Sequence, residues 1–216
     1  DKYIGESDDW DLCEQILQEI SDEMGLVAVK REGEAALYGP KLDFMFKDAL
    51  GKEVQIPTIQ LDFATPKRLK LVYIDNTGNE ATPVMLHRAV LGSYERFLAL
   101  IIEHFAGAFP VWLAPVQVAI IPISEKNNAY AQKVARILKE KGIRVEVNEK
   151  DETMQAKIRD AQMQKVPYML VVGGREESEE AVNVRLRDGK TVGMVKTEEF
   201  LQKVAQKYLT KALDLW

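Results

Sequence analysis

The pattern of hydrophobic residues changes near Pro115, and this change constrains the fold more than any other feature of the sequence. Before it, short segments of alternating hydrophobic and polar residues are separated by turn sequences. After it, hydrophobic runs alternate with stretches that have a helical period. Two-residue alternation is typical of half-buried strands, whereas strands joined by helices are typical of a parallel sheet. We therefore expect two domains, residues 1–113 and residues 114–216.

The first half is expected to form an antiparallel sheet after a helix over residues 10–24. Its first strand, KLDFMFKD, places Leu42, Phe44 and Phe46 on one face. Further strands follow at hairpin spacing over residues 53–63, 68–75 and 82–90. Such short connections favour antiparallel pairing, because a parallel crossover requires about a dozen residues or more. A helix after Ser93 carries a broad hydrophobic stripe, which predicts that it packs deeply, across the sheet.

The strand EVQIPTIQLDF (53–63) contains a change of phase. Hydrophobic residues occupy even positions up to Ile56 and odd positions from Ile59 onward. One extra residue near Pro57 would correct the phase and bring Gln55 and Gln60 to the same polar face. This is typical of a β-bulge, at which proline is tolerated. The alternative is an edge-strand proline with two ordinary exposed glutamines.

The second half is expected to form a small α/β domain with a mixed sheet of five strands. Hydrophobic strands are predicted over residues 116–123, 143–147 and 168–172, with helices over 127–141 and 153–165 between them. These strands should be parallel, with right-handed crossovers. A hairpin across Asp188 and Gly189 adds antiparallel strands, and Thr197 is expected to cap a final helix.

Composition excludes several classes of protein. The chain of 216 residues is 46% hydrophobic and 29% charged, which supports a sizeable core and argues against disorder. The lone Cys13 excludes an internal disulfide and a cysteine-rich zinc site, and it fits a reducing compartment. No hydrophobic run approaches the length of about 20 residues that spans a bilayer. The acidic N-terminal segment does not have the pattern of a signal peptide.

Charge is spread unevenly between the two halves. Residues 1–113 hold 11 basic and 19 acidic residues, whereas residues 114–216 hold 18 basic and 15 acidic ones, and the net charge is −5. A more basic half weakly favours a polyanionic partner there. A chance division of charge between two domains is an equally good interpretation of this balance alone.

Arg96 and His87 are the candidate functional residues of the segment PVMLHRAVLGSYERF (83–97). Ser93 is a suitable N-cap, which places Arg96 in the first helical turn, where the helix already carries partial positive charge. A bound phosphate would make this arrangement favourable, because its negative charge attracts both the helix N-terminus and the Arg96 guanidinium. The alternatives are a surface arginine paired with an acid and a structural histidine held by a hydrogen bond.

The segments YGPKLDF, TIQLDF, PVMLHRAVLGSYERF and AGAFPVWLAPVQV, followed by AKIRDAQMQKVPYMLVVG, together resemble the C-terminal part of a bacterial-type threonyl-tRNA synthetase. The likeness runs in order along essentially the whole chain. It implies an α+β fold in which part of the antiparallel sheet of a class II catalytic domain precedes an α/β anticodon-binding domain. It also implies a cytoplasmic ligase that joins threonine to its tRNA and works as a homodimer.

The resemblance assigns roles to individual residues. GSYERF is similar to class II motif 3, which implies that Arg96, with Ser93 beside it, contacts ATP bound with magnesium. His87 is similar to a histidine that ligates zinc in the threonine pocket. The residues that the resemblance places at the adenylate and threonine sites are Tyr38, Lys41, Gln55 and Gln60. Those that it places at the anticodon are Asp151, Glu176 and Arg185.

The sequence also departs from the family pattern. Pro57 stands where the family usually has glycine, and Asp151 stands where it often has asparagine. Motifs 1 and 2 and the other zinc ligands are not found in these residues, so we expect no zinc binding and no activation of threonine by this chain alone. A non-catalytic relative that keeps RNA binding is the main alternative. A generic small-molecule α/β module is the other, although no glycine-rich phosphate loop follows residues 116–123.

Overall fold

The computed structural model describes residues 2–216, and the chain divides into two compact units. The first ends at Glu103 and the second spans His104–Trp216. The border that the sequence suggested, after residue 113, lies in the irregular segment that precedes the first strand of the second unit. Each unit has its own sheet, as the change of pattern near Pro115 predicts.

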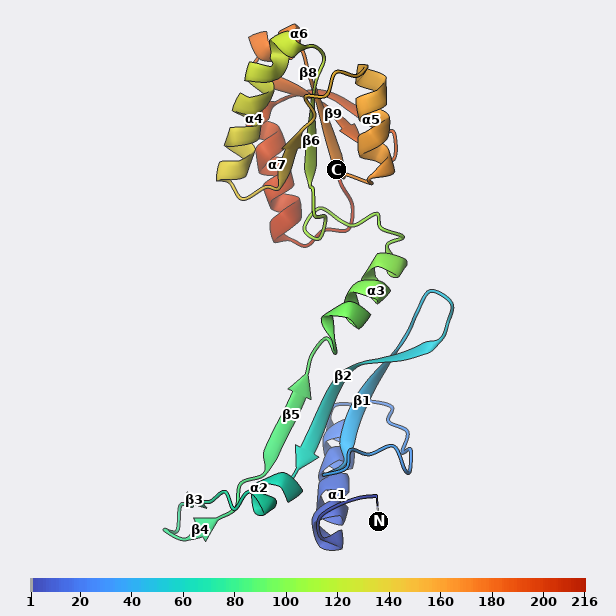
Figure 1. Cartoon of the computed structure of the whole chain (residues 1–216), viewed down its shortest axis with the longest axis vertical. Coiled ribbons are helices and arrows are strands. Elements are labelled where there is room, and N and C mark those ends of the chain that lie inside the picture. Colours follow the sequence, from blue (N-terminus) through green and yellow to red (C-terminus); the bar gives the residue numbers. More distant parts are fainter. Residues whose placement is uncertain (1) are drawn as a thin grey trace. The chain divides into compact units, whose positions relative to one another are not determined.

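The first unit is built around a three-stranded antiparallel sheet in the order β1-β2-β5 (Figure 1). Its strands are β1 (Lys41–Lys47), β2 (Glu53–Asp62) and β5 (Met85–Ala89). The helix α1 (Ser7–Glu23) precedes the sheet, and the short helix α2 (Ala64–Arg68) follows β2. A separate two-stranded hairpin consists of β3 (Tyr73–Ile74) and β4 (Glu80–Ala81), and α3 (Tyr94–His104) ends the series.

The predicted β-bulge is confirmed. Asp43 pairs with Thr58 and Met45 pairs with Gln55, so Ile56 and Pro57 of β2 together oppose one residue of β1. β2 is the central strand of its sheet, which excludes the edge-strand alternative. A proline has no N–H to give to a ladder, and a bulge is a position in a central strand at which this loss is tolerated.

Two predictions about the first unit are wrong. Residues 68–75 do not form a strand of the main sheet, because α2, a turn and the two-residue strand β3 occupy this segment. α3 is not deeply packed, since none of its residues is buried and Leu98 and Ile102 remain about half exposed. The helix does carry the predicted hydrophobic stripe, but no element of the described residues packs over it.

The second unit has the predicted five-stranded mixed sheet, in the order β10-β9-β8-β6-β7. Its parallel strands are β6 (Val118–Pro122), β7 (Val145–Val147) and β8 (Tyr168–Val172), and β9 (Ala181–Leu186) and β10 (Thr191–Lys196) form the hairpin. The helices are α4 (Asn128–Glu140), α5 (Met154–Met163), α6 (Gly174–Ser178) and α7 (Thr197–Leu209), with a 3-10 turn over Glu125–Asn127. α6 was not predicted, and Thr197 lies inside α7, where its hydroxyl donates to the Glu180 carbonyl instead of capping the helix.

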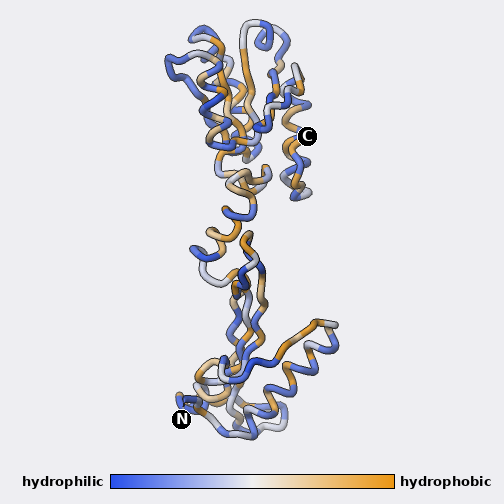
Figure 2. Tube along the Cα trace, turned by 90° about the vertical axis from the view of Figure 1, so that its right-hand side faces the viewer, coloured by the Kyte–Doolittle hydropathy of each residue, from blue (hydrophilic) through white to orange (hydrophobic). Residues whose placement is uncertain are grey.

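The well-buried core of the described chain lies in the second unit. α4 and α7 cover one face of the sheet and α5 covers the other (Figure 1). Every residue of β6 and β8 is buried, as expected for strands enclosed on both faces. The first unit has only a small cluster around Cys13, Phe63 and Ala64. Figure 2 shows hydrophilic and hydrophobic residues alternating along α1, whose Leu12 remains 56% exposed.

No helix within residues 2–216 is long and apolar enough to cross a bilayer.

Candidate functional site

The polar face of the first sheet gathers the residues that the sequence singled out. Cross-strand pairing places Lys41 opposite Gln60, and Gln60 opposite His87, so one row crosses β1, β2 and β5. The bulge returns Gln55 to the same face as Gln60. Without the extra residue the period of two would turn Gln55 to the opposite face of the sheet.

Tyr38 connects the loop before β1 to this row. Its hydroxyl donates to Gln60 Oε1 at 2.5 Å, and its ring centroid lies 5.1 Å from that of His87. Gly39 allows the loop to come this close, because a Cβ at this position would lie 1.8 Å from the Leu61 carbonyl oxygen. The tight approach of loop and strand thus fixes the tyrosine over the sheet.

Asp43 joins the lysine and the other glutamine. Its carboxylate accepts hydrogen bonds from Gln55 Nε2 at 2.7 Å and from Thr58 Oγ1 at 2.6 Å, and it forms an ion pair with Lys41. The Lys41 and Asp43 side chains are 18% and 19% exposed, so the pair is partly shielded from solvent. Asp43 therefore orients both Lys41 and Gln55, a role that the sequence did not reveal.

Asp62 holds His87. His87 Nε2 lies 3.0 Å from Asp62 Oδ2, and the Thr65 amide donates to Asp62 Oδ1 at 2.8 Å. Burial acts to raise the pKa of the Asp62 carboxyl, but the hydrogen bonds from His87 and Thr65 outweigh it and hold that pKa below its usual value. An ionised carboxylate only accepts, so Nε2 is the ring nitrogen that donates in this contact.

Arg96 lies beside the bulge. Its backbone amide donates to Ser93 Oγ at 3.3 Å, which confirms Ser93 as the N-cap, and Nη1 contacts the Gln55 carbonyl at 3.4 Å. Gly92, with φ of +66°, lets the start of the helix approach the Ile56 carbonyl. No carboxylate among residues 2–216 pairs with Arg96, so the alternative of a surface arginine paired with an acid is not met. Most of its guanidinium donors are available to a ligand.

The three predicted anticodon residues occupy different parts of the second unit. Asp151 is exposed in the loop between β7 and α5, and Arg185 is half-buried in β9. Glu176 is only 8% exposed in α6, and its Oε2 accepts from the Gly173 amide at 3.0 Å. Among the described residues no hydrogen bond or ion pair joins these three side chains.

The comparisons with known proteins follow this division of the chain. The family model "tRNA synthetase class II core domain (G, H, P, S and T)" matches residues 6–105, and the model "Anticodon binding domain" matches residues 117–207. Threonine–tRNA ligase of Thermus thermophilus is 51% identical over 214 residues, which cover 99% of this chain and 32% of the relative. The chain belongs to the threonyl-tRNA synthetase family.

Other members of the synthetase family agree. Threonine–tRNA ligase of Geobacillus kaustophilus is 50% identical over 95% of this chain. A second comparison is with the crystal structure of the RNA binding domain of threonyl-tRNA synthetase from Cryptosporidium parvum, which superposes with a TM-score of 0.89. Its sequence is 36% identical to this one, and the match covers 99% of this chain and 54% of that one. The chain spans about a third of the length of the curated synthetases that it matches.

Residues 2–216 do not by themselves form a zinc site. They contain no cluster of three or more histidine, cysteine or acidic side chains that could hold a metal ion. A structural zinc takes four ligands, and a catalytic one takes three besides water or substrate. The Asp62 carboxylate does hold His87 in the way that carboxylates orient metal-bound histidines in zinc proteins. His87 is thus a candidate ligand that the described residues do not surround with enough partners to complete a site.

Proposed function

We propose that this chain takes part in joining threonine to its tRNA, with the first unit supplying part of the site for ATP and threonine. The observation that carries this proposal is the polar row of the first sheet. Tyr38, Gln60 and His87 are held together by the contacts described above, and Asp43 orients Lys41 and Gln55. The row contains no activated nucleophile, so its chemistry is binding and orientation of polar ligands.

Within this proposal Arg96 binds a phosphate of ATP. Its guanidinium makes one long contact with protein, to the Gln55 carbonyl, and a guanidinium matches phosphate oxygens in a two-point contact. Magnesium, bound with ATP, would offset further phosphate charge. Gln55, Gln60 and Tyr38 would contact the adenylate and threonine through neutral donors and acceptors.

A site specific for threonine must distinguish its hydroxyl from the methyl group that valine carries at the same position. A hydrophobic pocket separates such isosteres weakly, whereas a site with buried polar partners separates them strongly. In the proposed full-length enzyme, zinc ligated in part by His87 would supply this polar contact when bound. Asp62 holds the His87 ring in the orientation that leaves Nδ1 free for it.

The second unit is proposed to bind threonine tRNA and to read its anticodon. Single-stranded RNA is recognised by contacts to the edges of unstacked bases. Arg185 is half-buried, and none of the described residues accepts a hydrogen bond from its guanidinium. Asp151 is exposed and acidic, so it can accept from the amino group of a base. Glu176 already accepts from Gly173, and its other oxygen is available.

Equilibrium filter binding tests the anticodon assignment. The Arg185→Ala variant should reduce the preference for threonine tRNA over the same tRNA with an altered anticodon more than it weakens total binding. Lys203→Ala, in α7 and remote from these residues, should affect every tRNA equally. A preference that survives Arg185→Ala unchanged would remove Arg185 from the reading site.

A further inference from the structure

The helix α1 carries two apolar faces, and only one of them is covered by other described residues. Trp10 and Cys13 pack in a cluster with Phe63. On another face, hydrophobic residues recur every four positions, continue to the residue that ends the helix and remain 37–70% exposed (Figure 2). They are Leu12, Ile16, Ile20 and Met24. Residues four apart are neighbours on a helix, so these side chains form one row, the α1 ridge.

The α1 ridge is not needed to hold the helix to its own unit. Trp10 and Cys13 already supply that contact. Single exposed hydrophobic residues are common on protein surfaces, whereas a continuous apolar surface marks an interface. At a rise of 1.5 Å per residue the ridge is about 18 Å long, which matches about three turns of a second helix.

The exposed stripe of α3 is of another kind. Residues 97–102 carry no charge, so apolar side chains surround much of that helix. A helix that is apolar on all sides is typical of a domain interior. The α1 ridge is narrow and is bordered by charged side chains, as expected for a surface contact with a polar rim.

Carboxylates border the α1 ridge. Glu19 lies three residues after Ile16, and Glu23 lies three residues after Ile20, a spacing that makes side chains neighbours on a helix surface. α1 has no lysine or arginine, and its acidic residues are Asp8, Asp9, Asp11, Glu14, Glu19, Asp22 and Glu23. Within residues 2–216, only Asp9 and Glu14 of this set pair with a lysine.

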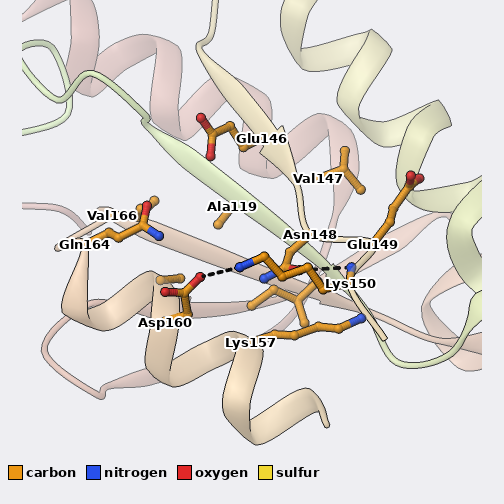
Figure 3. Close-up of a pocket in the computed structure, with 12 residues that line it drawn as sticks. Ala119, Glu146, Val147, Asn148, Glu149, Lys150, Lys157, Asp160, Gln164 and Val166 are labelled. Carbon is orange, nitrogen blue, oxygen red and sulfur yellow. Dashed lines mark hydrogen bonds and ion pairs between the residues drawn. The ribbon is translucent and has the colours of Figure 1, made fainter. Parts of the chain in front are cut away.

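The second unit offers a contrast. At the cavity between α5 and the strands β6 and β7, Asp160 pairs with Lys150 at 3.7 Å, and Figure 3 shows this pair at the cavity wall. Lys133 of α4 likewise pairs with Glu180 at 3.1 Å. The rim of the α1 ridge therefore differs in presenting charges of one sign that the described residues do not neutralise.

We propose that the α1 ridge docks an amphipathic helix of another protein, one whose apolar stripe is flanked by lysine or arginine. The row of apolar side chains on α1 packs between the rows of the partner helix, as in other helix pairs. The basic flanks then pair with Asp8, Glu19 and Glu23, and this complementarity of charge selects the partner. The proposal is independent of any reading of tRNA by the second unit.

A second copy of this chain fits the α1 ridge poorly. Two α1 helices packed ridge to ridge would bring only carboxylates to the rim of the contact, and like charges along a helix seam oppose pairing. An anionic membrane surface would meet the same repulsion. A cationic helix is the occupant that the charges favour.

Fluorescence anisotropy with two designed peptides of about 20 residues tests the proposal. Both peptides carry leucine at alternating intervals of three and four residues, and the other positions are lysine in one peptide and glutamate in the other. The protein is the whole 216-residue chain. Salt is held at about 0.15 M, where charges more than about 8 Å apart are largely screened.

Three double variants locate the binding surface. The ridge variant is Ile16→Gln with Ile20→Gln, and the rim variant is Glu19→Lys with Glu23→Lys. The matched control is Asp11→Lys with Asp22→Lys, which makes the same change of net charge on the opposite side of α1. All these positions are exposed, and circular dichroism checks that each variant keeps its helix content.

The lysine peptide should bind the unmodified chain, and the glutamate peptide should not. The ridge variant should weaken binding of the lysine peptide by at least about tenfold, because two apolar contacts are lost. The rim variant should weaken it by about tenfold and the control by less than about twofold. Equal affinity of the ridge variant and the unmodified chain, or no binding of the lysine peptide, would overturn the proposal.

Sedimentation and vesicle binding distinguish the other occupants. If the unmodified chain dimerises and the ridge variant stays monomeric, the ridge belongs to a second copy and the proposed partner is wrong. Binding to phosphatidylserine vesicles that the ridge variant loses would assign the ridge to a lipid surface instead. The proposal predicts a chain that neither dimerises through the ridge nor binds vesicles through it.

Discussion

Replacing Asp62 tests whether one buried carboxylate organises the polar face of the first unit. The side chain is 1% exposed and accepts from His87 Nε2 and from the Thr65 amide. Asp62→Asn keeps an acceptor for the Thr65 amide but loses the charge that faces His87. Asp62→Ala loses both acceptors, so the two variants separate the two contacts.

The expected magnitudes follow from these contacts. A hydrogen bond to a charged group contributes about 1.5–3 kcal/mol, and an acceptor at the start of a helix contributes about 1 kcal/mol. The His87 side chain is 40% exposed, so solvent screening places its bond at the lower end of that range. We expect Asp62→Asn to lower the local free energy of unfolding by about 1.5 kcal/mol and Asp62→Ala by about 2.5 kcal/mol.

Hydrogen–deuterium exchange measures this effect in one unit at a time. Amides of β2 and β5 report the opening of the first sheet, and amides of β8 in the second unit serve as the internal reference. Asp11→Ala, on the exposed face of α1, is the control. If β2 and β5 keep their protection in both Asp62 variants, the carboxylate does not anchor the polar face.

The pH dependence has a definite sign. Because the pKa of Asp62 is lower in the folded chain than its ordinary value of 3.8, its contribution is complete above that value and is lost as pH falls through the folded pKa. Protection of β2 and β5, relative to β8, should therefore decline below about pH 4. Asp62→Asn should remove this part of the acid sensitivity, and an unchanged profile would contradict the argument.

Three further predictions concern the remaining contacts. Gln117 is 1% exposed, and its side-chain amide joins the Val111 carbonyl to the Arg144 amide. Gln117→Leu should therefore destabilise the second unit by about 2–4 kcal/mol in thermal unfolding, whereas Gln202→Leu, at an exposed position of α7, should not. Gly39→Ala should reduce the exchange protection of β2, because the new Cβ collides with the Leu61 carbonyl, and Gly174→Ala, which meets nothing, is the control. Zinc titration should show no tight binding by this chain, and submicromolar stoichiometric binding lost in His87→Ala would refute that expectation.

Local sequence signals predicted much of the fold. The strands of the second unit followed from enclosed hydrophobic runs, and the bulge in β2 followed from the change of phase between Ile56 and Ile59. Ser93 was identified as a cap from its position before a helical stripe. These features depend on residues close in sequence, which is why a single chain is enough to reveal them.

Features set by distant contacts were predicted less well. The segment over residues 68–75 has the composition of a strand, but α2 ends at its first residue, Arg68, and a turn separates that helix from the two-residue strand β3. The packing of α3 could not be predicted because a hydrophobic stripe does not specify what covers it. Asp43 escaped notice because its role depends on Gln55 and Thr58, which only the pairing of β1 with β2 brings to it.

The most direct test of the account is the affinity of the unmutated chain for threonine tRNA and for the same tRNA with altered anticodon bases. Filter binding at two salt concentrations separates base reading from nonspecific phosphate attraction, because only the latter weakens steeply with salt. We expect a preference of about tenfold for the matched anticodon that persists at the higher salt concentration. Equal affinities for matched and altered anticodons at both salt concentrations would contradict the proposed reading of the anticodon.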